Sequence, residues 1–267
     1  MPAINLAHLK TQAARLADAF GTPDIFEREL HEMLDFYTNR TRRTDQAAKR
    51  YSLPIYYTPM PVLRQIELEL EPLADARPLE ALTLTEVLWQ ARSLESRLLA
   101  AYLLGTIPPA NALTLLSHLP DWLRFTTDRE IRRALLTDAL ARVRHENPVA
   151  LLLLLEAWLK SPNQRLQAWS LEALVPLVED KHFENLPTVF RLLRPAIEAV
   201  SPSTQLELQA CLAALERVSL TETTAFLRDL LEASSSPVLL SMLRRMLPAF
   251  SPKLQSTLRE WLRKKGA

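Results

Sequence analysis

Apolar residues recur along most of the chain at spacings of three and four, the period that places them on one face of an α-helix. Over residues 128–144, for example, one side of a helical wheel collects Leu135, Leu136, Ala139, Leu140 and Val143. No segment alternates apolar and polar residues over a run rich in Val, Ile and Thr, which is the pattern of a half-buried strand. The pattern therefore predicts an all-α protein.

Prolines and capping residues predict where these helices begin. The side chain of Ser or Thr accepts a hydrogen bond from a backbone N–H at a helix N-terminus. Proline suits the next position because backbone N–H groups in the first turn have no partner within the helix, so its missing N–H costs nothing there. Such pairs occur at Thr22-Pro23, Ser161-Pro162, Ser201-Pro202, Ser236-Pro237 and Ser251-Pro252, with Asn147-Pro148 in the same role. Residues 127–130 indicate a capping box, with Thr127 as the N-cap and Glu130 reaching back. Helices are expected over 4–20, 23–38, 61–76 and 83–92, and from near Ser93, Pro109, Thr127, Asn147, Ser161, His182, Ser201, Thr221, Ser236 and Ser251.

The spacing of these starts indicates a repeat. Starts near Ser93, Thr127, Ser161, Ser201 and Ser236 lie 34, 34, 40 and 35 residues apart, and a second helix falls within each interval. A two-helix unit that repeats every ~35–40 residues is typical of an α-solenoid, in which each unit buries its apolar face against its neighbours. We therefore predict a single domain over residues 1–267, an armadillo-type αα-superhelix of about six two-helix units, with an irregular basic loop at 39–60.

Composition excludes several kinds of site. With only three glycines, Gly21, Gly105 and Gly266, the chain holds no P-loop, no dinucleotide-binding glycine loop and no GxSxG elbow. Cys211 is the only cysteine, and the five histidines are scattered without metal-ligand spacing. We therefore expect no metal, no nucleotide and no other cofactor.

The same features bear on location. The first ten residues, MPAINLAHLK, lack a basic region followed by an apolar run, so no secretory signal is expected. The most apolar stretch, 149–159, is short for a bilayer span and carries Glu156, which indicates a buried helix. Together with the lone cysteine, these features predict a cytoplasmic protein without a membrane partner.

The net charge of +1 conceals an uneven distribution. Residues 39–50 carry five basic residues against Asp45, and the chain from Leu240 onward carries seven against Glu260. Basic clusters of this kind contact phosphates, and they also occur as solvated helix ends and loops. The residues that we expect to contact a nucleic acid are Arg40, Arg42, Arg43, Arg129, Arg132, Arg133, Arg165, Arg244 and Arg245.

Other side chains admit two interpretations. Asp138 lies at the edge of an apolar face, where it either pairs with Arg142 at i,i+4 or serves as an acidic group inside a basic groove. The five tryptophans lie at helical spacing among leucines, which favours core positions over base stacking. Tyr56 and Tyr57 lie in a proline-rich loop and are better candidates for exposed aromatic contact.

Three segments follow one another in an order that resembles a known family. They are TPMPVLRQIELELEPL at 58–73, LTEVLWQARSLESRLLAAYLLG at 84–105 and WLKSPNQRLQAWSLEALVPLV at 158–178. Over roughly residues 58–220 the chain resembles the bacterial HEAT-like-repeat DNA glycosylases of the DNA alkylation repair family. The resemblance implies an αα-superhelix with a basic concave face for duplex DNA, and excision of cationic N-alkylated purines.

The family's site residues transfer only in part. Its acidic position falls on Asp138, and its S-x-N helix start falls on Ser161 and Asn163. The chain departs from the family at its aromatic positions and its arginine pair, which fall on Ala134, Arg165, near Ala213, and on Gln167 and Ala168. A site of this kind needs aromatic faces for a cationic base and arginines for the phosphates.

Three hypotheses about function result. The preferred one is a non-catalytic scaffold that binds nucleic acid through the basic clusters. The second is a protein–protein interaction scaffold, as solenoids commonly are. The third is an alkylpurine DNA glycosylase with Asp138 as its catalytic carboxylate. A basic groove near Asp138 would favour the first and third, and an acidic or apolar one the second.

Overall fold

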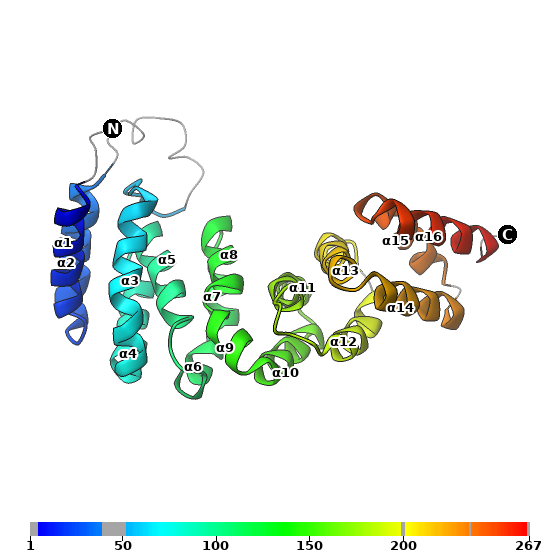
Figure 1. The fold of residues 1–267 in the computed structure, drawn as a ribbon, viewed down its shortest axis with the longest axis horizontal. Helices are drawn as coiled ribbons and strands as arrows, with labels where there is room; N and C mark the ends of the chain where they lie inside the picture. The colour runs from blue at the N-terminus through cyan, green and yellow to red at the C-terminus, as the bar shows by residue number, and fades with distance from the viewer. Residues whose placement is uncertain (1–4, 39–51, 199–200, 235, 266–267) are drawn as a thin grey trace. The chain divides into compact units, whose positions relative to one another are not determined.

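The computed structural model describes residues 5–38, 52–198, 201–234 and 236–265, and in these ranges all regular structure is helical (Figure 1). The helices of the first half are α1 (Leu6–Asp18), α2 (Pro23–Phe36), α3 (Met60–Ala76), α4 (Pro78–Gln90), α5 (Leu94–Leu104), α6 (Pro109–Leu116), α7 (Leu119–Arg124), α8 (Arg129–Thr137) and α9 (Ala141–Glu146). Those of the second half are α10 (Pro148–Leu159), α11 (Gln164–Val178), α12 (Leu186–Glu198), α13 (Gln205–Val218), α14 (Leu220–Ala233), α15 (Pro237–Met246), the 3-10 turn η2 (Leu247–Ala249) and α16 (Pro252–Lys265). The all-α prediction is confirmed for the described residues.

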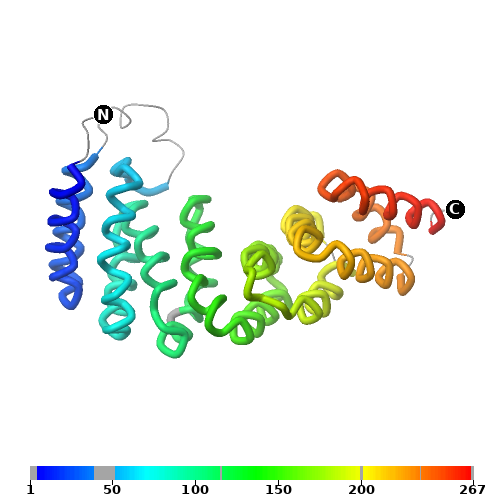
Figure 2. The backbone as a smooth tube through the Cα atoms, viewed as in Figure 1, coloured from blue at the N-terminus to red at the C-terminus, as the bar shows by residue number. Residues whose placement is uncertain are grey.

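The chain divides into two compact units, Met1–Glu146 and Asn147–Ala267. In the N-terminal unit most helices pack against a helix two or three places along the chain, while the backbone reverses direction from one helix to the next (Figure 2). Contacts join α1 to α3, α3 to α5 and α5 to α8, and others join α2 to α4, α4 to α6 and α6 to α9. These contacts place the helices of the unit in two layers.

The C-terminal unit repeats this sequential packing. Its helix α10 contacts α11 and α12, α11 contacts α13, and α13 continues through α14 to α16. Fully buried residues of its core include Leu174, Leu208, Cys211 and Leu258. Fully buried residues of the N-terminal unit include Phe20, Phe26, Leu70 and Leu84.

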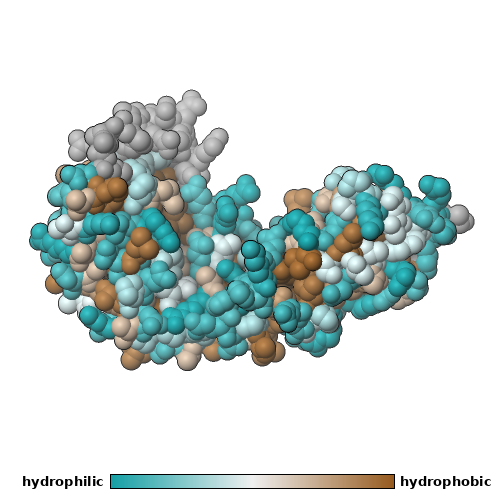
Figure 3. All heavy atoms as spheres, viewed as in Figure 1, coloured by the Kyte–Doolittle hydropathy of each residue, from teal (hydrophilic) through white to brown (hydrophobic). Residues whose placement is uncertain are grey.

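The tryptophans bear out their predicted place in part. Trp89, Trp122 and Trp158 are buried, whereas Trp169 and Trp261 are half-buried. Apolar residues also reach the surface, where they form small patches separated by hydrophilic side chains on the face that Figure 3 shows. Such scattered patches are normal for a folded protein.

Several predicted helix starts are confirmed in atomic detail. The Ser93 side chain accepts the Ser96 N–H at 3.1 Å and so caps α5, and the Asn147 side chain caps α10 through the Ala150 N–H at 3.1 Å. Prolines occupy the first turn of α2, α4 and α10, as their φ angle allows.

Other predicted starts are wrong. The N-cap of α8 is Asp128 rather than Thr127, and the Asp128 side chain makes no capping hydrogen bond because it contacts another segment described below. The N-cap of α11 is Asn163, whose side chain accepts the Arg165 N–H at 3.0 Å, so Ser161 lies before the helix. The N-cap of α13 is Thr204 rather than Ser201. Prolines also lie inside α3, α11 and α12, so they do not all start helices.

Candidate interaction site around Asp138

The helix predicted over 128–144 is interrupted at Asp138. Helix α8 ends at Thr137 and α9 begins at Ala141, so the prediction of one continuous helix is wrong. The cause is the backbone of Gly105, at the end of α5, which packs directly against the interruption. A Cβ atom at Gly105 would lie 1.8 Å from the Asp138 carbonyl oxygen, and the Gly105 carbonyl accepts the Arg142 N–H at 3.2 Å.

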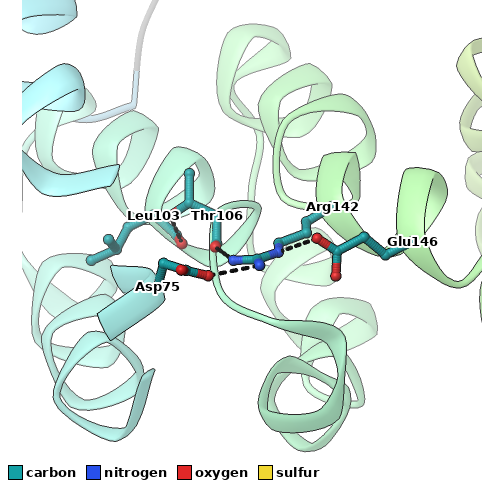
Figure 4. Close-up of polar contacts among 5 residues, drawn as sticks. All are labelled: Asp75, Leu103, Thr106, Arg142 and Glu146. Carbon is teal, nitrogen blue, oxygen red and sulfur yellow. Dashed lines mark hydrogen bonds and ion pairs between the residues drawn. The ribbon is translucent and has the colours of Figure 1, made fainter. Parts of the chain in front are cut away.

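Arg142, just after this interruption, makes polar contacts with residues of three segments (Figure 4). Its guanidinium contacts the Asp75 carboxylate on α3 at 2.7 Å and the Glu146 carboxylate on α9 at 2.6 Å. It also donates to the Thr106 carbonyl at 2.6 Å, in the turn after α5. The predicted Asp138–Arg142 pair is therefore wrong, because the guanidinium is directed to Asp75 and Glu146. One arginine thus joins three elements of the N-terminal unit.

Asp138 itself is exposed and lies among other acids. Its Oδ1 accepts the Thr137 hydroxyl at 3.0 Å. Burial raises the pKa of the Glu67 carboxyl on α3; the charges of Asp138 and Glu71 add to this rise, and the Arg64 guanidinium opposes it. The Asp138 carboxylate therefore acts electrostatically on a neighbouring acid.

The acids of α3 lie on one face, because Glu67, Glu71 and Asp75 are spaced by four residues. The Glu71 carboxylate accepts the Tyr102 hydroxyl of α5 at 3.1 Å. Burial, together with Glu71, raises the pKa of Tyr102 to about 12. We name Glu67, Glu71, Asp75 and Asp138 the acidic ridge.

The predicted nucleic-acid contacts are placed as follows. Arg129 and Arg133 are exposed on α8, with Arg132 partly covered, so these three share one helix, which ends at Thr137, directly before Asp138. In the C-terminal unit, Arg165 is exposed at the start of α11, and Arg244 and Arg245 are exposed near the end of α15. Arg40, Arg42 and Arg43 lie outside the described residues.

The positions that depart from the resembled family have ordinary packing roles. Ala134, Ala168 and Ala213 are buried in helix packing. Gln167 donates to the Ser161 carbonyl at 2.8 Å and lines a cavity of about 360 Å³ between α10, α11 and α12. Alanines and a backbone-bonded glutamine therefore stand at four positions where the resemblance implies aromatic rings and arginines.

The residues 52–59 form a polar site that the sequence did not indicate. Glu95, in the first turn of α5 and only 3% exposed, accepts the backbone N–H groups of Tyr56 at 3.0 Å and Thr58 at 3.4 Å. The Asp128 carboxylate accepts the N–H and hydroxyl of Ser52 at 2.9 and 2.6 Å. Two carboxylates thus hold this segment on the N-terminal ends of α5 and α8. A first-turn glutamate in a sequence gives no sign of such a distant partner.

The tyrosines of this segment are not exposed as predicted. Both are half-buried. The Tyr56 hydroxyl is hydrogen-bonded to His31 Nδ1 at 2.6 Å, and Tyr57 adopts a left-handed backbone conformation with φ of 54°. The prediction of exposed aromatic contact is wrong because the contacts of Glu95 draw the segment onto the helices.

The remaining chemistry of the described residues is sparse. Within 5–38, 52–198, 201–234 and 236–265, no three His, Cys, Asp or Glu side chains form a group that could hold a metal ion. Over the same residues, no helix combines the length and the apolarity that crossing a bilayer requires. Comparison of the chain with protein-family models, curated proteins and solved structures finds no match in any of the three.

Proposed function

We propose that this protein is a non-catalytic α-solenoid scaffold whose N-terminal unit binds a basic segment of a partner protein along the acidic ridge. The recurring contacts between a helix and the helix two or three places along the chain support the solenoid, since that is how repeat units share their apolar faces. Solenoids characteristically offer extended surfaces to long partners.

The observation that carries the proposal is the acidic surrounding of Asp138. The charge of Asp138 acts on Glu67 of α3, Glu71 acts on the same carboxyl, and Asp75 is 62% exposed although it pairs with Arg142. Opposite charge on a partner is steered toward such a surface, and phosphates are repelled by it. The geometry near Asp138 therefore favours a protein ligand over a nucleic-acid groove or a glycosylase site.

Binding of a fluorescein-labelled peptide of alternating lysine and glycine to the full chain tests this proposal by fluorescence anisotropy. We expect saturable binding that weakens with salt. The double variant Glu71→Gln/Asp138→Asn should bind about fivefold more weakly, since two exposed charge contacts of ~0.5 kcal/mol each are lost. The matched control Glu222→Gln/Asp229→Asn, in the C-terminal unit, should bind like the parent. Equal affinity of all three proteins would refute the acidic ridge as the binding surface.

A second candidate function rests on the C-terminal unit. Its last helices expose Arg244 and Arg245 on α15 and Lys253, Arg259 and Arg263 on α16, with Glu260 the only acid from Leu240 onward. This surface fits phosphates, which supports nucleic-acid binding there. Binding of labelled duplex and single-stranded DNA is titrated at several salt concentrations. In Arg244→Gln/Arg245→Gln the slope of log K against the logarithm of the salt concentration should become smaller by roughly two. An unchanged slope would rule out this surface.

A further inference from the structure

A cavity of about 630 Å³ lies between α2, α4 and the start of α7, in the N-terminal unit. Its lining residues are Glu27, Glu86, Val87, Gln90, Ala91, His118 and Trp122. The volume falls in the range of about 300–1,000 Å³ that is usual for ligand pockets. None of its lining residues belongs to the acidic ridge, so the cavity is a separate site.

One wall of the cavity is the end of a stack of rings. The indole of Trp122 lies on that of Trp89, with centroids 4.4 Å apart and planes 10° from parallel. The Arg97 guanidinium lies over the Trp89 ring, 4.8 Å from its centroid, and Arg97 Nε donates to the Trp89 carbonyl at 3.1 Å. Indole is the aromatic ring that attracts cations best. One end of the stack therefore already holds a guanidinium, and Trp122 at its other end lines the cavity.

The polar lining has the complementary charge for another cation. Glu27 and Glu86 bring carboxylates from two helices, and Gln90 adds an amide. Glu27 Oε1 lies 3.5 Å from His31 Nε2, whose ring is held by Tyr56 through the other nitrogen. Among the described residues, Glu86 has no ion-pair or hydrogen-bond partner, and no lysine or arginine lines the cavity. An incoming cation therefore meets the exposed Glu86 carboxylate.

We propose that this cavity receives one arginine side chain of a partner protein, with its guanidinium against the part of the Trp122 indole that lines the cavity and its N–H groups donating to Glu27 and Glu86. A planar guanidinium both stacks on an aromatic ring and donates from several directions, which a lysine ammonium does not do. The apolar side chains Val87 and Ala91 provide contact for the methylene stem. This proposal stands whether or not the acidic ridge binds a basic segment.

The test uses the ¹⁵N-labelled full chain and the tripeptide acetyl-Gly-Arg-Gly-amide. The Trp122 indole N–H signal is identified by its loss in Trp122→Phe. We expect a saturable shift of this signal with the arginine tripeptide, a weaker response with its lysine analogue, and none with its citrulline analogue, which is neutral and nearly isosteric. An equal response to citrulline, or no shift of the Trp122 signal, would overturn the proposal.

Charge-neutral variants separate this site from its surroundings. Glu27→Gln/Glu86→Gln should weaken tripeptide binding about tenfold, as expected for two charge-assisted contacts. Asp24→Asn/Glu80→Gln, on the same two helices but outside the lining, should bind like the parent. The acidic-ridge variant Glu71→Gln/Asp138→Asn should also bind like the parent, so failure of either proposal is distinguishable from failure of the other. Tighter binding of free spermidine than of the tripeptide would assign the cavity to polyamines and refute a protein ligand.

Discussion

Two buried glutamates, one in each unit, hold a loop against a helix in different ways. Glu95 on α5 uses one carboxylate oxygen for the N–H groups of Tyr56 and Thr58, and its Oε2 is buried without a hydrogen-bond partner among the described residues. Glu216 on α13, 7% exposed, uses both oxygens for the Ser251 N–H, at 3.0 and 3.1 Å, and also accepts the Ser251 hydroxyl. The two side chains are alike in type and burial but differ in how fully they are hydrogen-bonded.

This difference shows how hydrogen bonding determines whether burial of a carboxylate is unfavourable. Burial raises the pKa of Glu95, although its bonds to backbone N–H groups work against the rise. An oxygen that is buried without a donor favours the protonated form, since a proton removes the unfavourable charge. Glu216 instead engages both oxygens with the Ser251 N–H and hydroxyl at the start of α16, so the amide nitrogen of a glutamine there would face the Ser251 N–H.

The largest effect is expected from Glu216→Gln. The amide nitrogen of glutamine would face the Ser251 N–H, so at least one charge-assisted hydrogen bond is lost. We expect the C-terminal unit to lose about 2–3 kcal/mol of unfolding free energy. Urea denaturation followed by circular dichroism measures it. A loss below about 0.5 kcal/mol would show that the contacts to Ser251 do not stabilise this unit.

The reactivity of the Cys211 thiol measures the same loss of stability within the C-terminal unit. Cys211 lies on the same helix as Glu216, is fully buried, and burial raises its pKa to about 12, so it reacts only when the unit opens. If Glu216→Gln lowers the opening free energy by ~2 kcal/mol, disulfide exchange with an aromatic disulfide reagent should be about thirtyfold faster. Glu95→Gln should leave this rate unchanged, because it lies in the other unit. An equal acceleration by both variants would show that the two units do not open separately.

Ser251→Ala removes only the hydroxyl that donates to Glu216 and leaves the backbone N–H in place. We expect a smaller loss, about 1–1.5 kcal/mol, measured in the same denaturation experiment. A double-mutant cycle with Glu216→Gln should show that the two losses are not additive, since both remove one interaction. Full additivity would mean that the hydroxyl stabilises the unit by another route.

The smallest effect is expected from Glu95→Gln, whose carbonyl can keep both N–H groups and whose amide replaces the unpaired oxygen. The raised pKa means that the folded state binds the proton more tightly than the unfolded chain does. The parent should therefore match the variant below the ordinary glutamate value of 4.5 and lose stability relative to it as the pH rises through the raised pKa. Unfolding free energies of both proteins at a series of pH values test this. A difference that does not change with pH would contradict it.

What the sequence predicted well was local. The apolar period of the helices and the caps at Ser93 and Asn147 depend on residues within one or two turns, and the structure confirms them. The interruption at Asp138 could not be predicted in this way, because it depends on the Gly105 backbone in a different helix. Nor could the contacts of Glu95 and Arg142, whose partners Tyr56 and Asp75 are distant in the chain.

The candidate sites show the same contrast between features that the local sequence predicts and features that depend on distant residues. Charge clustering identified Arg129, Arg132 and Arg133. In the structure they lie on one face of α8, with Arg129 and Arg133 exposed and Arg132 partly covered. The acid on which the charge of Asp138 acts, Glu67, lies on α3, which α5 links to α8, and no local pattern specifies that packing. The cavity beside Trp122 likewise combines residues of three helices. Both proposed binding surfaces combine residues of different helices, and so become visible only in the fold.

Gly105 has a consequence for how this sequence can vary. Its φ and ψ of −72° and −7° are open to every amino acid, so a survey of backbone angles would class the position as free to change. Yet the smallest side chain would overlap the backbone of Asp138, which cannot turn aside as a flexible side chain can. Gly21 is the opposite case, since a Cβ there meets only the end of the Glu80 side chain. In a library of all single substitutions, position 105 should therefore accept almost nothing while position 21 accepts many residues, and the chain can diverge widely around a point that stays glycine.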